Sequence, residues 1–205
     1  MTNRCLSLNL SLKRNTVLKK KLYILLLCIF SGFQWLNAQN TEIIDKKQNF
    51  GFAVADNRKI DVIIVHSTFN NSGGEYYDID LVIKQFSRYK VNAHYVIGRD
   101  GKIFNLVDEK NIAYHAGRSI LPDGRTGINS CSIGIELMTS FSEAPAEAQI
   151  IALTALVNDI KSRHKIKYIL RHSDIAPDRK TDPWNMDWDD FIRRITNNET
   201  EDMKI

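Results

Sequence analysis

The pattern of apolar and polar positions predicts alternating strands and helices from about residue 60 onward. Short apolar runs bounded by polar residues are typical of buried strands, and they occur at residues 61–66, 93–97, 102–106, 131–137 and 168–171. Apolar residues at helical spacing predict helices over residues 78–89, 146–164 and 188–195. We therefore expect an α/β fold, a single domain in which a mixed central β-sheet is flanked by α-helices.

Local signals set several boundaries of these elements. Asp100-Gly101 is typical of a hairpin turn between the second and third strands. Ser142 and Pro145 are expected to open the second helix, and Asp187 to cap the last one. Residues 107–130 form a long loop in this interpretation, and loops of that length in a compact domain are usually functional.

The first 38 residues have the features of a secretory signal peptide. Lys19-Lys20-Lys21 form a basic region, residues 22–33 are an uncharged apolar run, and Ala38 offers a cleavage point. The run is shorter than the roughly 20 apolar residues of a membrane span, so an uncleaved anchor is the less favoured alternative. We expect an exported protein, periplasmic or secreted, that meets a membrane only through this leader.

The chain then divides into four parts. They are the signal peptide (1–38), a polar lead-in arm (39–58), one globular domain (59–198) and a short tail (199–205). Nothing in the sequence indicates the oligomeric state.

The net charge of +4 belongs to the leader and not to the domain. Residues 1–38 hold six basic residues and no acidic one. The rest of the chain has 22 basic and 24 acidic residues, a net charge of −2, so no nucleic-acid partner is expected. Cys131 is the one cysteine after residue 38, which excludes an internal disulfide in the mature chain and predicts a core thiol.

Two histidines mark the candidate chemistry of the domain. His66 and His172 lie at or just beyond the C-terminal ends of two predicted strands, and these ends meet at one sheet edge if the strands are neighbours. Two histidines and one carboxylate are a normal catalytic zinc set with an open position. Spacing alone leaves Asp174, Asp178 and Asp182 open as the carboxylate, and structural histidines are the alternative.

Glu136 lies on an unusual strand face. In the strand over residues 131–137, one face is apolar, whereas the other face has Ser132, Gly134 and Glu136. A carboxylate beside two residues of little bulk predicts a space on this face of the strand, with room for something other than side chains. The alternative is an edge strand with a solvated polar face.

Five segments resemble, in order, the zinc-dependent N-acetylmuramoyl-L-alanine amidases, a superfamily that includes phage lysozyme-type amidases and animal peptidoglycan recognition proteins. They are IIVHST, NAHYVIGRDGKI, AYHAG, NSCSIGIEL and HSDIAPDRKTDP, and the resemblance runs from about residue 60 to 195. It implies an amidase domain with a mixed sheet flanked by helices. It also implies zinc ligands and two catalytic groups: ligands His66, His172 and Asp182, catalytic carboxylate Glu136 and catalytic cation Lys180.

The resemblance further implies the reaction and its substrate. The expected activity is hydrolysis of the amide between N-acetylmuramic acid and L-alanine, in peptidoglycan or in muropeptides. A non-catalytic peptidoglycan-binding module and a zinc peptidase acting within the stem peptide are the alternatives. His94 and His115 are candidates for substrate binding, although a hydrogen-bonded structural role is favoured for His94. The chain departs from the family after Pro183, where Trp184 replaces the common Gly-Pro, and substrate fit is expected to differ there.

Overall fold

Six strands form one mixed sheet in the computed structural model, which describes residues 42–202. Their order is β1-β5-β4-β7-β3-β8. Strands β4, β7, β3 and β8 are parallel, β5 is antiparallel to β4, and β1 is parallel to β5. The bounds of the strands are Ile43–Asp45 (β1), Val62–Thr68 (β3), Tyr95–Ile97 (β4), Ile103–Asn105 (β5), Ser132–Met138 (β7) and Tyr168–Arg171 (β8).

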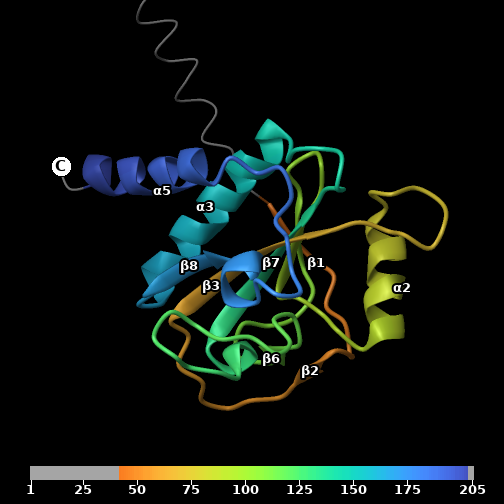
Figure 1. Cartoon of the computed structure of the whole chain (residues 1–205), viewed down its shortest axis with the longest axis horizontal. Coiled ribbons are helices and arrows are strands. Elements are labelled where there is room, and N and C mark those ends of the chain that lie inside the picture. Colours follow the sequence, from red (N-terminus) through yellow and green to blue (C-terminus); the bar gives the residue numbers. More distant parts are fainter. Residues whose placement is uncertain (1–41, 203–205) are drawn as a thin grey trace, which may run out of the picture. The chain divides into compact units, whose positions relative to one another are not determined.

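Four α-helices and a small second sheet complete the described part of the chain (Figure 1). The helices are α2 (Ile79–Tyr89), α3 (Glu147–Arg163), α4 (His172–Ile175) and α5 (Trp188–Asp202). β2 (Phe52–Ala53) and β6 (Ile112–Ala113) pair as the second sheet, and Ile128–Ser130 form a 3₁₀ turn. The predicted α/β fold with a mixed sheet and flanking helices is confirmed.

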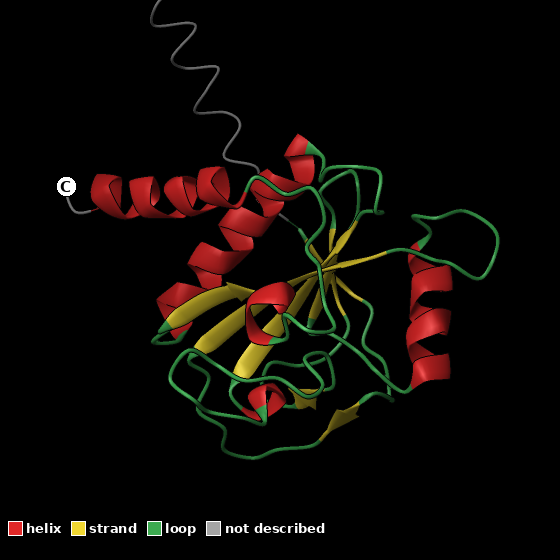
Figure 2. Cartoon of the chain, viewed as in Figure 1, coloured by secondary structure: helices red, strands yellow, loops and turns green. Residues whose placement is uncertain are grey.

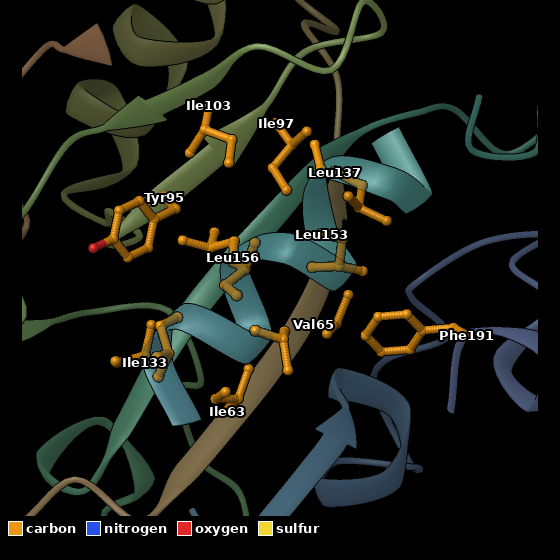
Figure 3. Packing of buried hydrophobic residues seen from close by; sticks show 14 of the residues in the cluster. Ile63, Val65, Tyr95, Ile97, Ile103, Ile133, Leu137, Leu153, Leu156 and Phe191 are labelled. Carbon is orange, nitrogen blue, oxygen red and sulfur yellow. The ribbon is translucent and has the colours of Figure 1, made fainter. Parts of the chain in front are cut away.

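The main sheet has a different covering on each face. On one face α3 and α5 pack on the strands, and α2 lies on the opposite side (Figure 2). Figure 3 shows Leu153 and Leu156 of α3 above the strands, with Phe191 of α5 beside Val65. The other face of β3 packs instead on the long loop and α4, through Ile128 and Ile175 among others. Since side chains alternate along β3, His66 points to the face that α3 does not cover.

Several element boundaries differ from those predicted. β1 and β2 come from the residues predicted as a polar lead-in arm, because backbone pairing needs little apolar content at a sheet edge. Gln149 Oε1 accepts the N–H of Ala146 at the start of α3, so the side chain of Ser142 does not open this helix. α5 continues to Asp202, beyond the predicted end at residue 195.

Two other local predictions are confirmed. Asp187 Oδ1 accepts the N–H of Asp190 and caps α5, as predicted. At α2, for which no cap was predicted, Asp78 Oδ1 accepts the N–H groups of Asp80 and Leu81. Gly101, with a φ of 84°, closes the hairpin between β4 and β5. Cys131, predicted as a core thiol, is instead a free, half-buried thiol just before β7 that packs against the edge of the cluster around Ile128.

The predicted leader lies outside the described residues. Within residues 42–202, no helix is long and apolar enough to cross a membrane.

Helix α3 allows a direct test of where the core lies. Leu153 is fully buried, whereas Ile151 on the same helix is 46% exposed. We expect Leu153→Ala to lower the free energy of unfolding by about 2–5 kcal/mol, because it removes buried contacts and leaves a cavity. Ile151→Ala is the control and should change it by less than about 0.5 kcal/mol. Urea denaturation followed by circular dichroism measures both, and equal losses would contradict this assignment of the core.

Candidate active site

Two neighbouring strands bring His66 and His172 together. β3 pairs in parallel with β8, and the pair Val65 and Arg171 lies immediately before the two histidines. Both side chains are buried, and their ring centroids are 4.3 Å apart. The predicted convergence of the two imidazoles at one sheet edge is therefore confirmed.

Asp182 completes a group of three possible metal ligands. His66 Nδ1 lies 2.9 Å from His172 Nδ1 and 3.5 Å from Asp182 Oδ2, and His172 Nδ1 lies 3.1 Å from the same oxygen. Ligands about 2.1 Å from a tetrahedral metal are about 3.4 Å from one another, so these separations suit one shared ion. Two imidazole nitrogens and a carboxylate are donors that bind divalent transition metals. The group can therefore hold a metal ion.

The structure distinguishes among the three aspartates that spacing left open. Asp174 accepts hydrogen bonds from the backbone N–H and the guanidinium of Arg171, at the start of α4. Asp178 is exposed, whereas Asp182 is buried beside the two histidines. Asp182 alone of the three belongs to the candidate metal group.

The charges within the group favour metal binding. Burial and the neighbouring His172 lower the pKa of His66 to about 4, so its ring is neutral near pH 7. Burial disfavours the charged form of Asp182, but hydrogen bonds with His172 and His66 outweigh it and hold its pKa well below the usual range. A neutral imidazole and an ionised carboxylate are the forms that ligate metals.

Glu136 lies directly beside His66 in the sheet. The two residues are register partners on β7 and β3 and point to the same face. Glu136 Oε2 is buried and has no hydrogen-bond partner in the described part of the chain. Burial, with a further contribution from the Asp182 carboxylate, raises the pKa of Glu136 to about 8, while Lys180 acts in the opposite direction. A carboxyl group in this environment readily takes up and releases a proton near neutral pH.

One cavity of about 310 Å³ connects these groups. Its lining includes all five residues that the family resemblance singles out, and substrate-sized space thus adjoins both the candidate metal group and Glu136. The lining residues are His66, Ser67, Thr68, Gln85, Phe86, Tyr89, Val91, Asn92, Tyr114, His115, Glu136, His172, Lys180, Asp182 and Trp184.

His115 fills the space beside Gly134. A Cβ atom built on Gly134 would lie 2.4 Å from His115 Cγ, so the ring packs directly on the backbone of β7. The prediction of room for something other than side chains is therefore wrong at Gly134, where a loop side chain occupies the space, and is confirmed at Glu136, which lines the cavity. The edge-strand alternative is also wrong, since β7 lies between β4 and β3.

The structure places His94 away from the cavity. This side chain is fully buried, and its Nδ1 accepts the N–H of Gly134 while its Nε2 lies 3.1 Å from Asn111 O. Burial, followed by the nearby Arg58, lowers the pKa of His94 to about 3. Both ring nitrogens are thus engaged within the protein. His115, in contrast, lines the cavity.

Arg58 supports the site from a segment that the sequence interpretation left as a lead-in arm. Its guanidinium donates to three backbone carbonyls, at Glu109, Asn129 and Ser132. These bonds tie the long loop to the start of β7. A single arginine in a polar segment has no spacing pattern, so the sequence held no signal for this role.

An aromatic ledge lies beside the cavity, formed by Phe69, Tyr76, Phe141 and Trp184. The rings of Phe141 and Trp184 are 4.2 Å apart at their centroids, and Phe69 packs against both. Trp184 also lines the cavity. The isolated aromatic residues in otherwise polar loops were the signal that sequence reasoning did not use.

Comparison with known proteins gives consistent similarities. Residues 56–185 match the family described as N-acetylmuramoyl-L-alanine amidase. N-acetylmuramoyl-L-alanine amidase AmiD of Escherichia coli (strain K12) is 36% identical over 143 residues, which are 61% of this chain and 49% of AmiD. 1,6-Anhydro-N-acetylmuramyl-L-alanine amidase AmpD of Citrobacter freundii is 38% identical over 117 residues, which are 56% of this chain and 62% of AmpD.

Solved structures of these two kinds of protein share the fold. A selenomethionine derivative of AmpD has a TM-score of 0.65 and 28% sequence identity. The match covers 75% of this chain and 94% of the AmpD chain. AmiD in complex with anhydro-N-acetylmuramic acid-L-Ala-D-γ-Glu-L-Lys has a TM-score of 0.57 and 31% sequence identity. The match covers 69% of this chain and 60% of the AmiD chain. The chain spans about half to three fifths of the length of these curated relatives.

The candidate metal group gives a matched test within one loop. We expect the protein to bind one equivalent of a divalent transition-metal ion, and Asp182→Asn to weaken this binding by about 100-fold or more. Loss of a residue that only hydrogen-bonds a metal ligand already lowers metal affinity about 10- to 100-fold. Asp182 is itself a candidate ligand, so a larger loss of affinity is expected. Asp178→Asn removes an exposed carboxylate of the same loop and should leave the affinity unchanged.

Titration against a chromophoric chelator measures both affinities. Equal affinities for the two variants would exclude Asp182 as a ligand.

Proposed function

Because this chain belongs to the N-acetylmuramoyl-L-alanine amidase family, we propose that it hydrolyses the amide between N-acetylmuramic acid and L-alanine in muropeptides. One observation supports this most directly: His66, His172, Asp182, Glu136 and Lys180 all border one cavity. The names of the relatives point to the same bond, and AmpD and the AmiD complex point to 1,6-anhydromuramoyl substrates.

Zinc is the proposed metal, held by His66, His172 and Asp182. This set of donors with one open position is typical of catalytic zinc. When bound, zinc lowers the pKa of a water molecule toward 7 and polarises a carbonyl group. Glu136 Oε2, which has no hydrogen-bond partner among residues 42–202, and the adjoining cavity leave space for the reacting groups beside the ion.

Glu136 is the proposed proton carrier. Its Oε2 accepts a proton from the attacking water as the oxygen–carbon bond forms at the lactyl carbonyl. The same oxygen then delivers the proton to the alanine nitrogen as the carbon–nitrogen bond breaks. The products are the sugar carboxylate and a free stem peptide.

Lys180 is the proposed stabiliser of the carbonyl oxygen. Its side chain borders the cavity two residues before Asp182 in the loop. A fixed ammonium stabilises the negative charge that develops on that oxygen in the transition state.

Export is part of the proposal. It rests on the basic and apolar segments of the first 38 residues, and it places the enzyme in the periplasm or outside the cell. Detection of the mature N-terminus after residue 38 in the exported fraction would support it, and retention of the full chain in the cytoplasm would contradict it.

Product analysis tests the proposed reaction. We expect the purified protein to convert anhydro-N-acetylmuramic acid-L-Ala-D-γ-Glu-L-Lys into the free tripeptide and the anhydro sugar, as identified by mass spectrometry. A strong chelator should abolish turnover, and added zinc should restore it. A shortened stem still attached to the sugar would instead indicate a peptidase. Binding without turnover would indicate a recognition module.

Two substitutions test the proposed roles of the cavity residues. We expect Glu136→Gln and Lys180→Met each to lower kcat/KM by roughly 10²–10³, as removal of one transition-state group typically does. Both variants should keep zinc, because neither residue belongs to the metal group. Lys165→Met removes an exposed lysine outside the cavity and serves as the control. A variant with full activity and bound zinc would remove that residue from the mechanism.

A further inference from the structure

A chain of hydrogen bonds connects the long loop to the first candidate metal ligand. Ser132 Oγ lies 2.7 Å from Ile128 O and 3.1 Å from His115 Nε2. On the other side of the ring, His115 Nδ1 lies 3.0 Å from His66 Nε2. His66 then presents its Nδ1 to His172 and Asp182.

Only one arrangement of protons satisfies every bond in this chain when the rings are neutral. The carbonyl of Ile128 can only accept, so it takes the single hydroxyl proton of Ser132. Ser132 Oγ must then accept the Nε2–H of His115. The Nδ1 of His115 is left with a lone pair and accepts the Nε2–H of His66. The Nδ1 of His66 therefore has no proton.

His172 reaches the same state through a different partner. Its Nδ1 lies 3.1 Å from Asp182 Oδ2 and its Nε2 lies 3.2 Å from the carbonyl oxygen of Ala116, and both oxygens can only accept, so Nε2 has the proton when a metal ion takes Nδ1. Two bare nitrogens and the Asp182 carboxylate then face one another at separations of 2.9–3.5 Å. Three lone pairs at such distances repel unless a cation lies between them.

The fold holds the ring of His115 in place on several sides. Asn129 Oδ1 accepts the backbone N–H groups of His115 and Ala116, which are consecutive residues with partners in the candidate metal group. Gly134 lets the ring lie against β7, and the backbone N–H of Gly134 is itself bound by His94 Nδ1. The position of His115 is therefore built into the contact between the loop and the sheet.

We propose that His115 is a positioning residue for the metal: its Nδ1 accepts the Nε2–H of His66 and so fixes His66 Nδ1 as the ligand atom. Ser132 sets the tautomer of His115 in turn. The proposal rests on the metal site of the proposed function and requires nothing of the substrate. Outer partners of this kind typically contribute 10- to 100-fold to metal affinity.

Two substitutions of His115 separate the effect of its hydrogen bond on zinc affinity from the effect of its ring volume. His115→Phe keeps an aromatic ring but has no acceptor, and we expect it to weaken zinc binding by about 10- to 100-fold. His115→Asn has a side-chain oxygen that can replace Nδ1 as the acceptor, and it should recover most of the affinity. His164→Phe alters a histidine at the end of α3, outside the cavity, and is the matched control. Zinc affinity is measured in the full chain by competition with a chromophoric chelator.

Nitrogen-15 NMR of the zinc-loaded wild-type protein tests the proton arrangement without any substitution. We expect His115 to be protonated on Nε2 and bare on Nδ1, and His66 to be protonated on Nε2. The opposite tautomer of His115 would overturn the proposal even if the Phe variant failed to fold. Unchanged zinc affinity in His115→Phe would also overturn it.

The proposed function fails in a distinguishable way. A wild-type protein that binds no zinc would overturn the metal site itself, and with it the role of His115. A wild-type protein that binds zinc but shows no turnover would leave the role of His115 intact.

Discussion

The parallel pairing of β3 with β7 and β8 is the constraint on which the rest of the site depends. The register sets His66 opposite Glu136, and it places His172 directly after the pair of Val65 and Arg171. Side chains alternate along a strand, so a slip of one residue would turn His66 into the apolar face under α3. The burial of Ile63 and Val65 on that face opposes such a slip. The same apolar packing that stabilises the sheet therefore also fixes the geometry of the candidate metal group.

The two faces of β7 make different contacts. Ile133, Ile135 and Leu137 pack under α3, which is the hydrophobic contribution to stability. The opposite face has almost no bulk at Gly134, and the ring of His115 lies there. A loop can thus reach the sheet closely enough for a side chain to touch His66. The small residues of β7 are therefore best explained by contact with the loop and not by an open space.

The sequence predicted the parts of this arrangement that depend on local patterns. Apolar runs located β3, β7 and β8, and the convergence of His66 and His172 followed from strand ends in a parallel sheet. Asp182 was beyond such reasoning, because three aspartates in one polar loop have equivalent spacing. Its identification came from the family resemblance, and the structure agrees because Asp174 is engaged by Arg171.

Contacts between segments far apart in the chain account for what the sequence did not predict. β1 pairs with β5 across 60 positions, and a three-residue edge strand has too short a pattern to be recognised. The ring of His115 reaches His66 from the long loop, and Arg58 donates to backbone carbonyls of that loop and of β7, so both sets of contacts depend on the complete fold.

Strands and loops contribute differently to the site: strands position most of its chemical groups, and loops shape the cavity. His66 and Glu136 lie within strands and His172 follows one directly, so the sheet holds these three groups, whereas Lys180 and Asp182 lie on the loop before α5. Trp184 lies on a loop and lines the same cavity, and the rest of the aromatic ledge lies on loops and packs beside it. Trp184 is also where this chain departs from the Gly-Pro that the family resemblance leads one to expect. A loop can exchange a glycine for a tryptophan without moving the sheet, so the shape of the cavity can change while His66, His172 and Glu136 keep their geometry.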